Sequence, residues 1–373
     1  MSQTDTAPPF PVSHPIPLSF SYVPRPGLLK ITLVNLVFNI LTLSIYRFWG
    51  KTNVRKHIWS CIHVNDEPLE YTGEGMELFK GFLVVFGLII LPFIVLTAAL
   101  HLAYGDNSPA AGAVSGIFGL FIYSMIGFAI YKARRYQLTR TQWRGIRGDL
   151  AGSAMTYSLL YFGNMMAKGM SLGWATPVMN TVLQEHITND MRFGDAAFKF
   201  RGPAGPLYPT YALCWFLFLV VLIISVMVIG GMLAGMDAAM SGTRSEKDFA
   251  MLGVGIVVVL LAFLAYMVIW PAIWSIYWAK QIRTFAEYTR FDGAQFKLNA
   301  TAGSLIGLTV INFLILVFTL GTFWPFIQQR NFRFIADRLK LEGAIDVDRI
   351  RQSMLAMPKR GEGLADAFDV SAW

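Results

Sequence analysis

The sequence has 373 residues, of which 55% are hydrophobic and only 14% charged, and its formal net charge is +8. Soluble domains carry about 25% charged residues, so this composition excludes an ordinary soluble protein. The basic residues stand next to hydrophobic segments, where membrane topology and anionic lipid headgroups account for them. We therefore expect membrane lipids as partners and no nucleic-acid binding.

Apolar segments dominate the chain after a polar, Pro-rich stretch that we predict to be a disordered tail, residues 1–17. Four segments approach or exceed the roughly 20 residues that a helix needs to cross a bilayer. These predicted spans are 78–102, 112–131, 207–234 and 251–279. Three weaker segments, 28–46, 154–179 and 305–327, contain Asn, Gly, Thr or Lys. The pattern predicts an all-α polytopic protein of the bacterial cytoplasmic (inner) membrane.

An internal repeat organises these segments. In each weak segment an asparagine stands seven residues before a short turn-like motif, giving the pairs Asn35 and Thr42, Asn164 and Ser171, and Asn312 and Thr319. Each repeat is predicted to hold a broken or re-entrant helix, a basic interfacial helix, a short aromatic strand and a transmembrane hairpin. The predicted boundaries are 18–136 for repeat 1, 137–295 for repeat 2, 296–345 for a partial repeat 3, and 346–373 for a polar C-terminal tail.

The short aromatic strands are expected around Tyr22, Tyr71, Phe200 and Leu298, where apolar residues alternate with polar ones. Alternation with a period of two is typical of a strand with one buried face. We expect these strands on the cytoplasmic side, some of them pairing into a small sheet. Aromatic residues anchored at the membrane interface are the alternative interpretation.

Two stretches carry a resemblance to a known family. The run GLLKITLVNLVFNILTLSIYRFWGKTNVRKHIWS, followed by EYTGEGMELFKGFL, resembles the opening of the YjgN-like inner-membrane family, and NFLILVFTLGTFWPFIQQRNFRF is similar to its closing copy. The resemblance extends from about Leu18 to Leu341, while MSLGWATPVMNTVLQEH in the middle departs from the pattern. It implies an inner-membrane location and a helical fold, but no activity or catalytic residues, because the family is a domain of unknown function.

Loop charge gives the expected topology, since cytoplasmic loops are enriched in Lys and Arg. Residues 47–58, 132–147, 280–297 and 330–340 are basic, whereas 103–111 contains no Lys or Arg and 236–248 holds two against three acids. If all basic segments are cytoplasmic, the weak helices enter the membrane, break near the turn motif and return. The alternative is seven crossings with an inverted repeat, as in many secondary transporters.

The candidate site residues form two groups. Intramembrane polar residues join helices through hydrogen bonds or line a solute pathway, and the candidates are Asn35, Thr42, Asn164, Ser171, Asn312 and Thr319. Basic residues among aromatic ones are typical of headgroup contacts, and those candidates are Arg47, Lys51, Arg55, Lys56, Arg134 and Arg135. The acids at positions 66, 67, 70, 74 and 77 are interpreted as a solvated linker pairing with Arg55 and Lys56.

Two classes of function follow from this pattern. A small-solute or lipid transporter, or a channel, would place a site between the pseudo-repeats. A protein that organises lipid or binds lipids or partner proteins without transport is the alternative. We expect no enzyme activity, no cofactor and no metal site, because the sequence contains no catalytic or metal-ligand motif with the required spacing.

Overall fold

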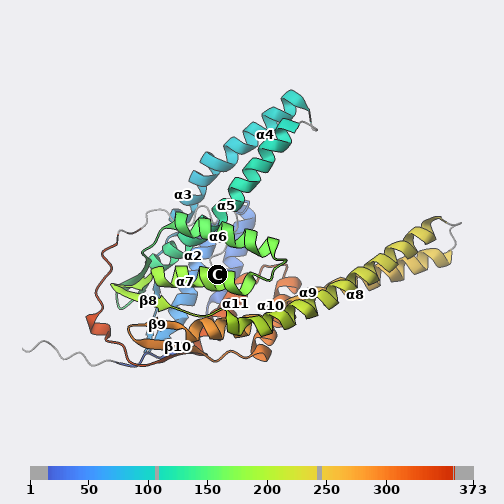
Figure 1. Cartoon of the computed structure of the whole chain (residues 1–373). Helices are drawn as coiled ribbons and strands as arrows, with labels where there is room; N and C mark the ends of the chain where they lie inside the picture. Colours follow the sequence, from blue (N-terminus) through green and yellow to red (C-terminus); the bar gives the residue numbers. More distant parts are fainter. Residues whose placement is uncertain (1–15, 106–108, 242–245, 356, 358–373) are drawn as a thin grey trace, which may run out of the picture. The chain divides into compact units, whose positions relative to one another are not determined.

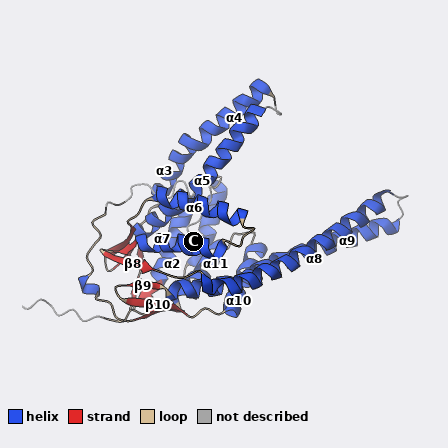
Figure 2. Cartoon of the chain, viewed as in Figure 1, coloured by secondary structure: helices blue, strands red, loops and turns tan. Residues whose placement is uncertain are grey.

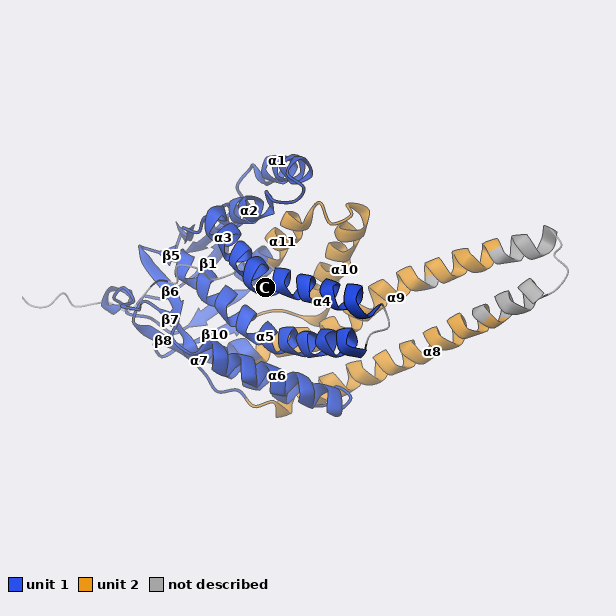
Figure 3. Ribbon diagram, turned by 90° about the horizontal axis from the view of Figure 1, so that it is seen from above, with its two compact units in different colours: residues 1–202, 285–298, 332–373 blue, residues 203–284, 299–331 orange. Residues whose placement is uncertain are grey.

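The computed structural model describes residues 16–105, 109–241, 246–355 and 357. The predicted tail 1–17 and the predicted loops 103–111 and 236–248 therefore lie partly outside the described residues. The chain divides into two compact units, one of residues 1–202, 285–298 and 332–373, the other of residues 203–284 and 299–331 (Figure 3).

Four helical stretches are long and apolar enough to cross a membrane, and they match the four predicted spans. The first is α3 (Gly75–Val85), continued by the π-helix η1 (Phe86–Ile90) and α4 (Leu91–Tyr104). The second is α5 (Pro109–Arg140), which runs beside it (Figure 1). The short 3-10 helix η2 (Gly205–Leu207) leads into α8 (Tyr208–Ser241), which is followed by α9 (Glu246–Glu287). Their windows are almost wholly exposed, which suits lipid rather than water as their surroundings.

Each weak segment folds as a helix that ends at the turn motif and is followed by a second, more polar helix. The pairs are α1 (Leu28–Leu41) with α2 (Arg47–Cys61), α6 (Ala154–Met170) with α7 (Thr176–Asp190), and α10 (Ala302–Phe318) with α11 (Trp324–Ala336). We refer to these three as the helix pairs. Of the basic segments 47–58, 132–147 and 280–297, the first forms a helix of its own, α2. The basic stretches after the second and fourth spans continue α5 and α9 instead, because nothing in 131–140 or 276–287 interrupts helical hydrogen bonding.

The fold prediction holds in part: the described residues are mostly helical, but short strands pair into extended sheets, which an all-α class does not include (Figure 2). Between the helices lie four hairpins with two-residue turns: β2 (Ile62–Val64) with β3 (Glu67–Pro68), β5 (Thr141–Trp143) with β6 (Ile146–Leu150), β7 (Met191–Phe193) with β8 (Ala196–Phe200), and β9 (Thr289–Phe291) with β10 (Ala294–Leu298). The remaining strands are β1 (Phe20–Tyr22), β4 (Glu70–Tyr71) and β11 (Leu339–Glu342).

Hairpin turns of this length favour residues with positive φ. Asn65 and Asp66 have φ 48° and 63°, and Asp292 and Gly293 have φ 46° and 86°. In the other two turns the residues with positive φ are Arg144 and Gly145 in one and Gly194 in the other. Turn chemistry therefore fixes the register of each hairpin.

The strands form two antiparallel sheets that connect into a closed circuit, which we call the closed sheet. The first sheet has the order β1-β2-β3, and one residue along the chain separates β3 from β4. β4 is the first strand of the second sheet, in which β4 to β11 pair in sequence order. Ser19, just before β1, bridges Lys340 of β11 and completes the circuit. The four expected aromatic strands are all present, as β1, β4, β8 and β10, but each pairs with strands that the sequence pattern did not predict.

The residues after β11 cross the hairpin turns of this closed sheet. Ile345, Val347 and Ile350 are buried in its core beside Trp143 and Phe291. Val347 and Ile350, within the stretch predicted as a polar tail from residue 346, thus pack in this core. The short 3-10 helix η3 (Val347–Arg349) lies within this stretch. We call residues 343–353 the strap.

Candidate functional site

The turn motif has the same backbone conformation in all three helix pairs. Leu43, Leu172 and Leu320 have φ of 50°, 50° and 49°, in the left-handed region that is costly for a leucine. The third residue after each first helix donates its N–H back to the carbonyl five residues earlier: Ser44 to Asn39, Gly173 to Lys168 and Gly321 to Leu316, at 2.7–2.9 Å. This bond satisfies carbonyls left open at the end of the first helix.

The hydroxyl residues of the motif join the two helices of a pair. Thr42 Oγ1 donates to the carbonyl of Phe38 at 2.6 Å and accepts the backbone N–H of Tyr46 at 2.9 Å. Thr319 makes the same two bonds, to Ile315 at 2.6 Å and from Phe323 at 3.3 Å. Ser171 accepts from Ala175 at 2.9 Å. A hydroxyl at this position therefore ends one helix and begins the next.

The asparagines also bond within their own helix pair. Asn35 Nδ2 donates to the carbonyl of Gly50 at 3.2 Å, and Asn164 Nδ2 to the carbonyl of Met179 at 3.3 Å. Both acceptors stand fifteen residues further along the chain. In the third pair Asn312 instead bonds side chains, donating to Asn331 at 2.7 Å and accepting from Arg330 at 3.0 Å. The six motif residues thus fall into three local clusters, each inside one helix pair.

The tips of the helix pairs are exposed and apolar. Leu43, Leu172 and Leu320 are 89%, 79% and 93% exposed. Leu41, Met170 and Phe318, which end the first helices, are also exposed. A strained backbone that presents a large apolar side chain to the surroundings needs a partner outside the chain, because neither strain nor exposure stabilises the fold in water.

The basic candidates have different environments. Arg47 and Lys56 are exposed. Arg55 is buried, donates to the Tyr71 hydroxyl at 3.2 Å and lies over the Tyr71 ring. Arg135 pairs with Asp149 at 3.3 Å, while Arg134 and Lys51 are partly buried. Headgroup contacts are therefore open to Arg47 and Lys56, whereas Arg55 and Arg135 serve the fold.

Two of the acids pair with arginines that the sequence pattern did not predict. Glu77 receives two bonds from Arg140, at 2.7 and 3.0 Å, and a third from the Tyr136 hydroxyl at 2.6 Å. Glu67 forms a two-bond pair with Arg144, and this hydrogen bonding holds the pKa of Glu67 below its ordinary value. Arg140 is the last residue of α5, and Arg144 lies in the turn between β5 and β6. Sequence proximity favoured Arg55 and Lys56, but sheet pairing decides the partners.

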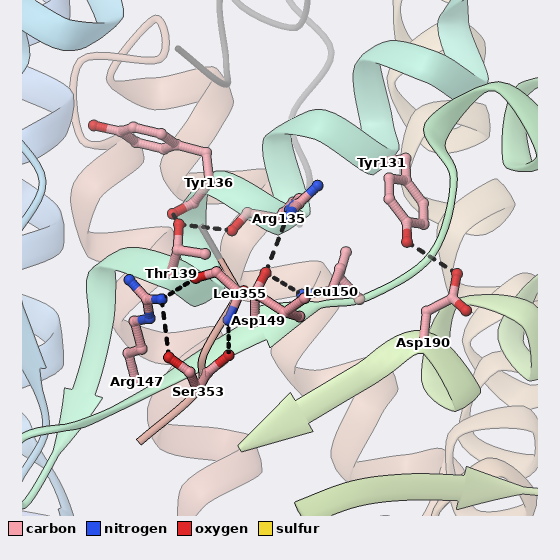
Figure 4. A network of polar contacts seen from close by, with 10 residues as sticks. All are labelled: Tyr131, Arg135, Tyr136, Thr139, Arg147, Asp149, Leu150, Asp190, Ser353 and Leu355. Atoms are coloured by element: carbon pink, nitrogen blue, oxygen red, sulfur yellow. Dashed lines mark hydrogen bonds and ion pairs between the residues drawn. The ribbon is translucent and has the colours of Figure 1, made fainter. Parts of the chain in front are cut away.

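A polar network connects the end of α5, β6 and the strap (Figure 4). The carboxylate of Asp149 is fully buried and accepts from Arg135 and from the N–H of Leu150 at 2.7 Å. Arg147 donates to the carbonyls of Ser353 and Leu355. Nearby, the Tyr131 hydroxyl donates to Asp190 at 2.9 Å. Among the described residues no three His, Cys, Asp or Glu side chains gather as a metal site would require.

The interior of the closed sheet holds a cavity of about 200 Å³. Its walls are apolar and mainly aromatic, with Phe20, Trp143, Phe193, Phe198, Phe291 and Phe296 among the lining residues. Ile345, Val347 and Ile350 of the strap also line it. The cavity arises from pairing between strands that lie far apart in sequence, which local patterns do not reveal.

The motif, the turns and the described strands after β1 fall within a stretch that matches a known family. The sequence profile of the family described as "Bacterial protein of unknown function (DUF898)" matches residues 24–367. The chain belongs to this family. The expected resemblance to YjgN-like proteins is also confirmed, since the chain is 31% identical over 116 residues to "Inner membrane protein YjgN" of Salmonella typhimurium. That match covers 31% of this chain and 27% of the relative. No solved structure matches the chain.

Membership of this family and the four apolar helical stretches make the chain an integral membrane protein. The parts that sequence reasoning missed are the strap and seven of the eleven described strands. Signals for the hairpins do exist, because Asn-Asp at 65–66 and Asp-Gly at 292–293 are typical two-residue turn sequences. No comparable signal marks the strap, whose three buried apolar residues stand among charged ones.

Proposed function

We propose that this DUF898 protein organises the lipid of one membrane leaflet and does not transport a solute. In this proposal four helices cross the membrane, the closed sheet lies on the cytoplasmic side, and the three helix pairs enter the cytoplasmic leaflet and return. The observation that carries the proposal is the row of strained, exposed leucines at the tips, Leu43, Leu172 and Leu320.

The closed sheet supports the proposal that each helix pair enters the membrane and returns on the same side. The strands before and after each pair belong to the closed sheet: β1 and β2 flank the first pair, β6 and β7 the second, and β10 and β11 the third. A chain that leaves and rejoins the same sheet crosses the membrane an even number of times. Seven crossings with an inverted repeat would put successive strands on opposite faces.

Helix length supports entry without crossing. The 14 residues of α1 and the 17 of α10 correspond to about 21 and 25 Å of helix, less than the roughly 30 Å of a bilayer core. Their partners α2 and α11 are polar and carry Arg47, Lys51 and Arg330. Such a pair is suited to the boundary between acyl chains and headgroups, with the apolar tip pointing inward.

Two further observations favour lipid organisation over transport. The side-chain amides that were candidates for a solute pathway, on Asn35, Asn164 and Asn312, donate within their own helix pairs. The hairpin turns and the strap carry Arg144, Arg349 and Arg351, as expected for a cytoplasmic surface next to anionic lipid.

The depth of the tips tests the proposal. A nitroxide label is placed on Leu43→Cys, Leu172→Cys or Leu320→Cys in nanodiscs, and its collisions with oxygen and with a water-soluble nickel chelate are compared. We expect oxygen-rich, chelate-poor labels at all three tips. Lys297→Cys on the exposed face of β10 is the control and should report water. Tip labels as accessible to the chelate as the control label would disprove leaflet insertion.

A further inference from the structure

The cavity inside the closed sheet is large for an apolar space in a folded protein. Packed interiors contain few voids larger than a water molecule, and an apolar cavity of roughly 150 Å³ takes up a benzene-sized ligand. This cavity measures about 200 Å³, and its walls come from β1, β2 and every strand from β5 to β10. It therefore has room for an apolar group larger than benzene.

The lining indicates the chemistry of the occupant. Six aromatic side chains and several aliphatic ones form the wall, whose surface is apolar. Leu138 also lines the cavity and lies on α5, two residues before that apolar helix ends. Through α5 the cavity wall is continuous with a predicted membrane span. An acyl chain of a membrane lipid fits both the apolar lining and this connection.

The strap closes the opposite end, where the hairpin turns lie. Gln352 Nε2 donates to the carbonyl of Gly145 at 2.7 Å, and the N–H of Arg351 donates to Asp195 at 3.0 Å. Arg349 pairs with Asp292 in a third turn. These contacts are exposed, whereas Ile345, Val347 and Ile350 point into the core. The strap is therefore held by exposed bonds to the turns, by the buried donor Arg147 and by the cavity wall.

We propose that the closed sheet binds the end of one fatty acyl chain of a membrane amphiphile, and that the strap seals the cavity over it. The site lies within a single compact unit, so the proposal stands independently of how deeply the helix-pair tips enter the leaflet. The chain end lies among the phenylalanines and Trp143.

Photolabelling of the full-length protein tests the binding site directly. Purified protein in nanodiscs is irradiated with a palmitic acid that carries a diazirine near the chain end, and labelled peptides are mapped by mass spectrometry. We expect label on the peptides that contain Trp143, Phe198 and Phe291. A phosphatidylglycerol with the same diazirine chain distinguishes a membrane phospholipid from a free acid as the source. Label from both probes confined to α3, α4, α8 and α9, or absent, would overturn the proposal.

Matched valine variants give the control. Val64 lines the cavity, whereas Val23 is 46% exposed and outside the lining. Val64→Phe should lower labelling of the cavity peptides about tenfold, corresponding to about 1.4 kcal/mol of binding, and Val23→Phe should leave it unchanged. Val347→Phe fills the cavity from the strap side and is the second variant if Val64→Phe unfolds. Equal cavity labelling in the wild type and in a folded filling variant would contradict the assignment.

Gly194 provides a test of the strap. A Cβ at this position would lie 2.2 Å from the carbonyl oxygen of Arg351, and the residue has φ 60°. Gly194→Ala therefore pushes the strap away from the β7–β8 turn. We expect faster labelling of the cavity peptides by the free acid, with the same peptides labelled at saturation. An unchanged rate would show that the strap does not gate the cavity.

Discussion

The side-chain amide of Asn35 donates to the backbone carbonyl of Gly50, fifteen residues away on the other helix of its pair. The two residues are packed so closely that a Cβ on Gly50 would lie 3.1 Å from the Asn35 side chain. Asn164 and Met179 repeat this relationship at the same sequence separation. A single hydrogen bond thus fixes how the apolar and polar helices of a pair lie against each other.

Loss of this bond should destabilise the protein. In Asn35→Leu the Gly50 carbonyl loses a donor in a buried place, and we expect the free energy of unfolding to fall by about 1 kcal/mol. Thermal unfolding in detergent measures the change. Asn53→Leu on the exposed face of α2 is the control and should stay within about 0.5 kcal/mol of the wild type. Equal effects of the two substitutions would contradict a structural role for Asn35.

Replacing one of the left-handed leucines by aspartate tests its surroundings. Relief of backbone strain should raise the stability of the protein, whereas a charge in lipid should lower it. In Leu320→Asp the new residue tolerates a φ near 49° better, which would stabilise the protein by about 1 kcal/mol if the tip were in water. A carboxylate within the bilayer costs up to about 3 kcal/mol. We expect net destabilisation of about 1–2 kcal/mol for unfolding in nanodiscs. A rise in stability would place this tip in water.

The Glu77 carboxylate is central to the contact between α3 and α5. Glu77→Gln keeps the size of the side chain but removes the charge that accepts two bonds from Arg140 and one from Tyr136. We expect a loss of about 2 kcal/mol, because Arg140 is buried and loses its ion pair. Chemical denaturation reports the loss, with the exposed Glu70→Gln as the control. The account of this contact fails if Glu77→Gln is as stable as Glu70→Gln.

Histidine 57 should make stability depend on pH. Burial lowers the pKa of His57 below its usual 6.5, and the charge of Arg25 acts in the same direction. The unfolded chain therefore binds more protons below pH 6.5, so this contribution to stability is complete above that pH and is lost as the pH falls toward the folded pKa. Unfolding measured between about pH 5 and 7 should show a slope that His57→Gln reduces. The same slope in both proteins would exclude His57 as its source.

The helical part of the fold could be predicted from sequence because it depends on local patterns. Continuous apolar runs located the four spans, and the seven-residue spacing from Asn312 to Thr319 located the turn at which a helix ends. The sheet could not be predicted in the same way. Strands of three residues such as β5 and β7 carry too little alternation, and their partners are chosen by tertiary pairing.

The cavity and the polar network depend on contacts across the sequence. Phe198 stacks on Phe291, and Arg147 binds the carbonyl of Ser353 more than 200 residues away. Neither pair has a local signature. The motif residues were recognised from their spacing, but the backbone carbonyls that they bond became visible only in the folded chain.

The location of the hairpin turns relative to the membrane tests the central claim, that one closed sheet returns every helix pair to the same side. Single cysteines at Asn65, Arg144, Asp195 and Asp292 are treated in intact cells with a thiol reagent that does not cross the inner membrane, and a cysteine at Tyr104, at the end of α4, serves as the external control. We expect labelling at Tyr104→Cys alone in intact cells and at all five positions after permeabilisation. Labelling of any one hairpin turn in intact cells, with another turn protected, would contradict the claim.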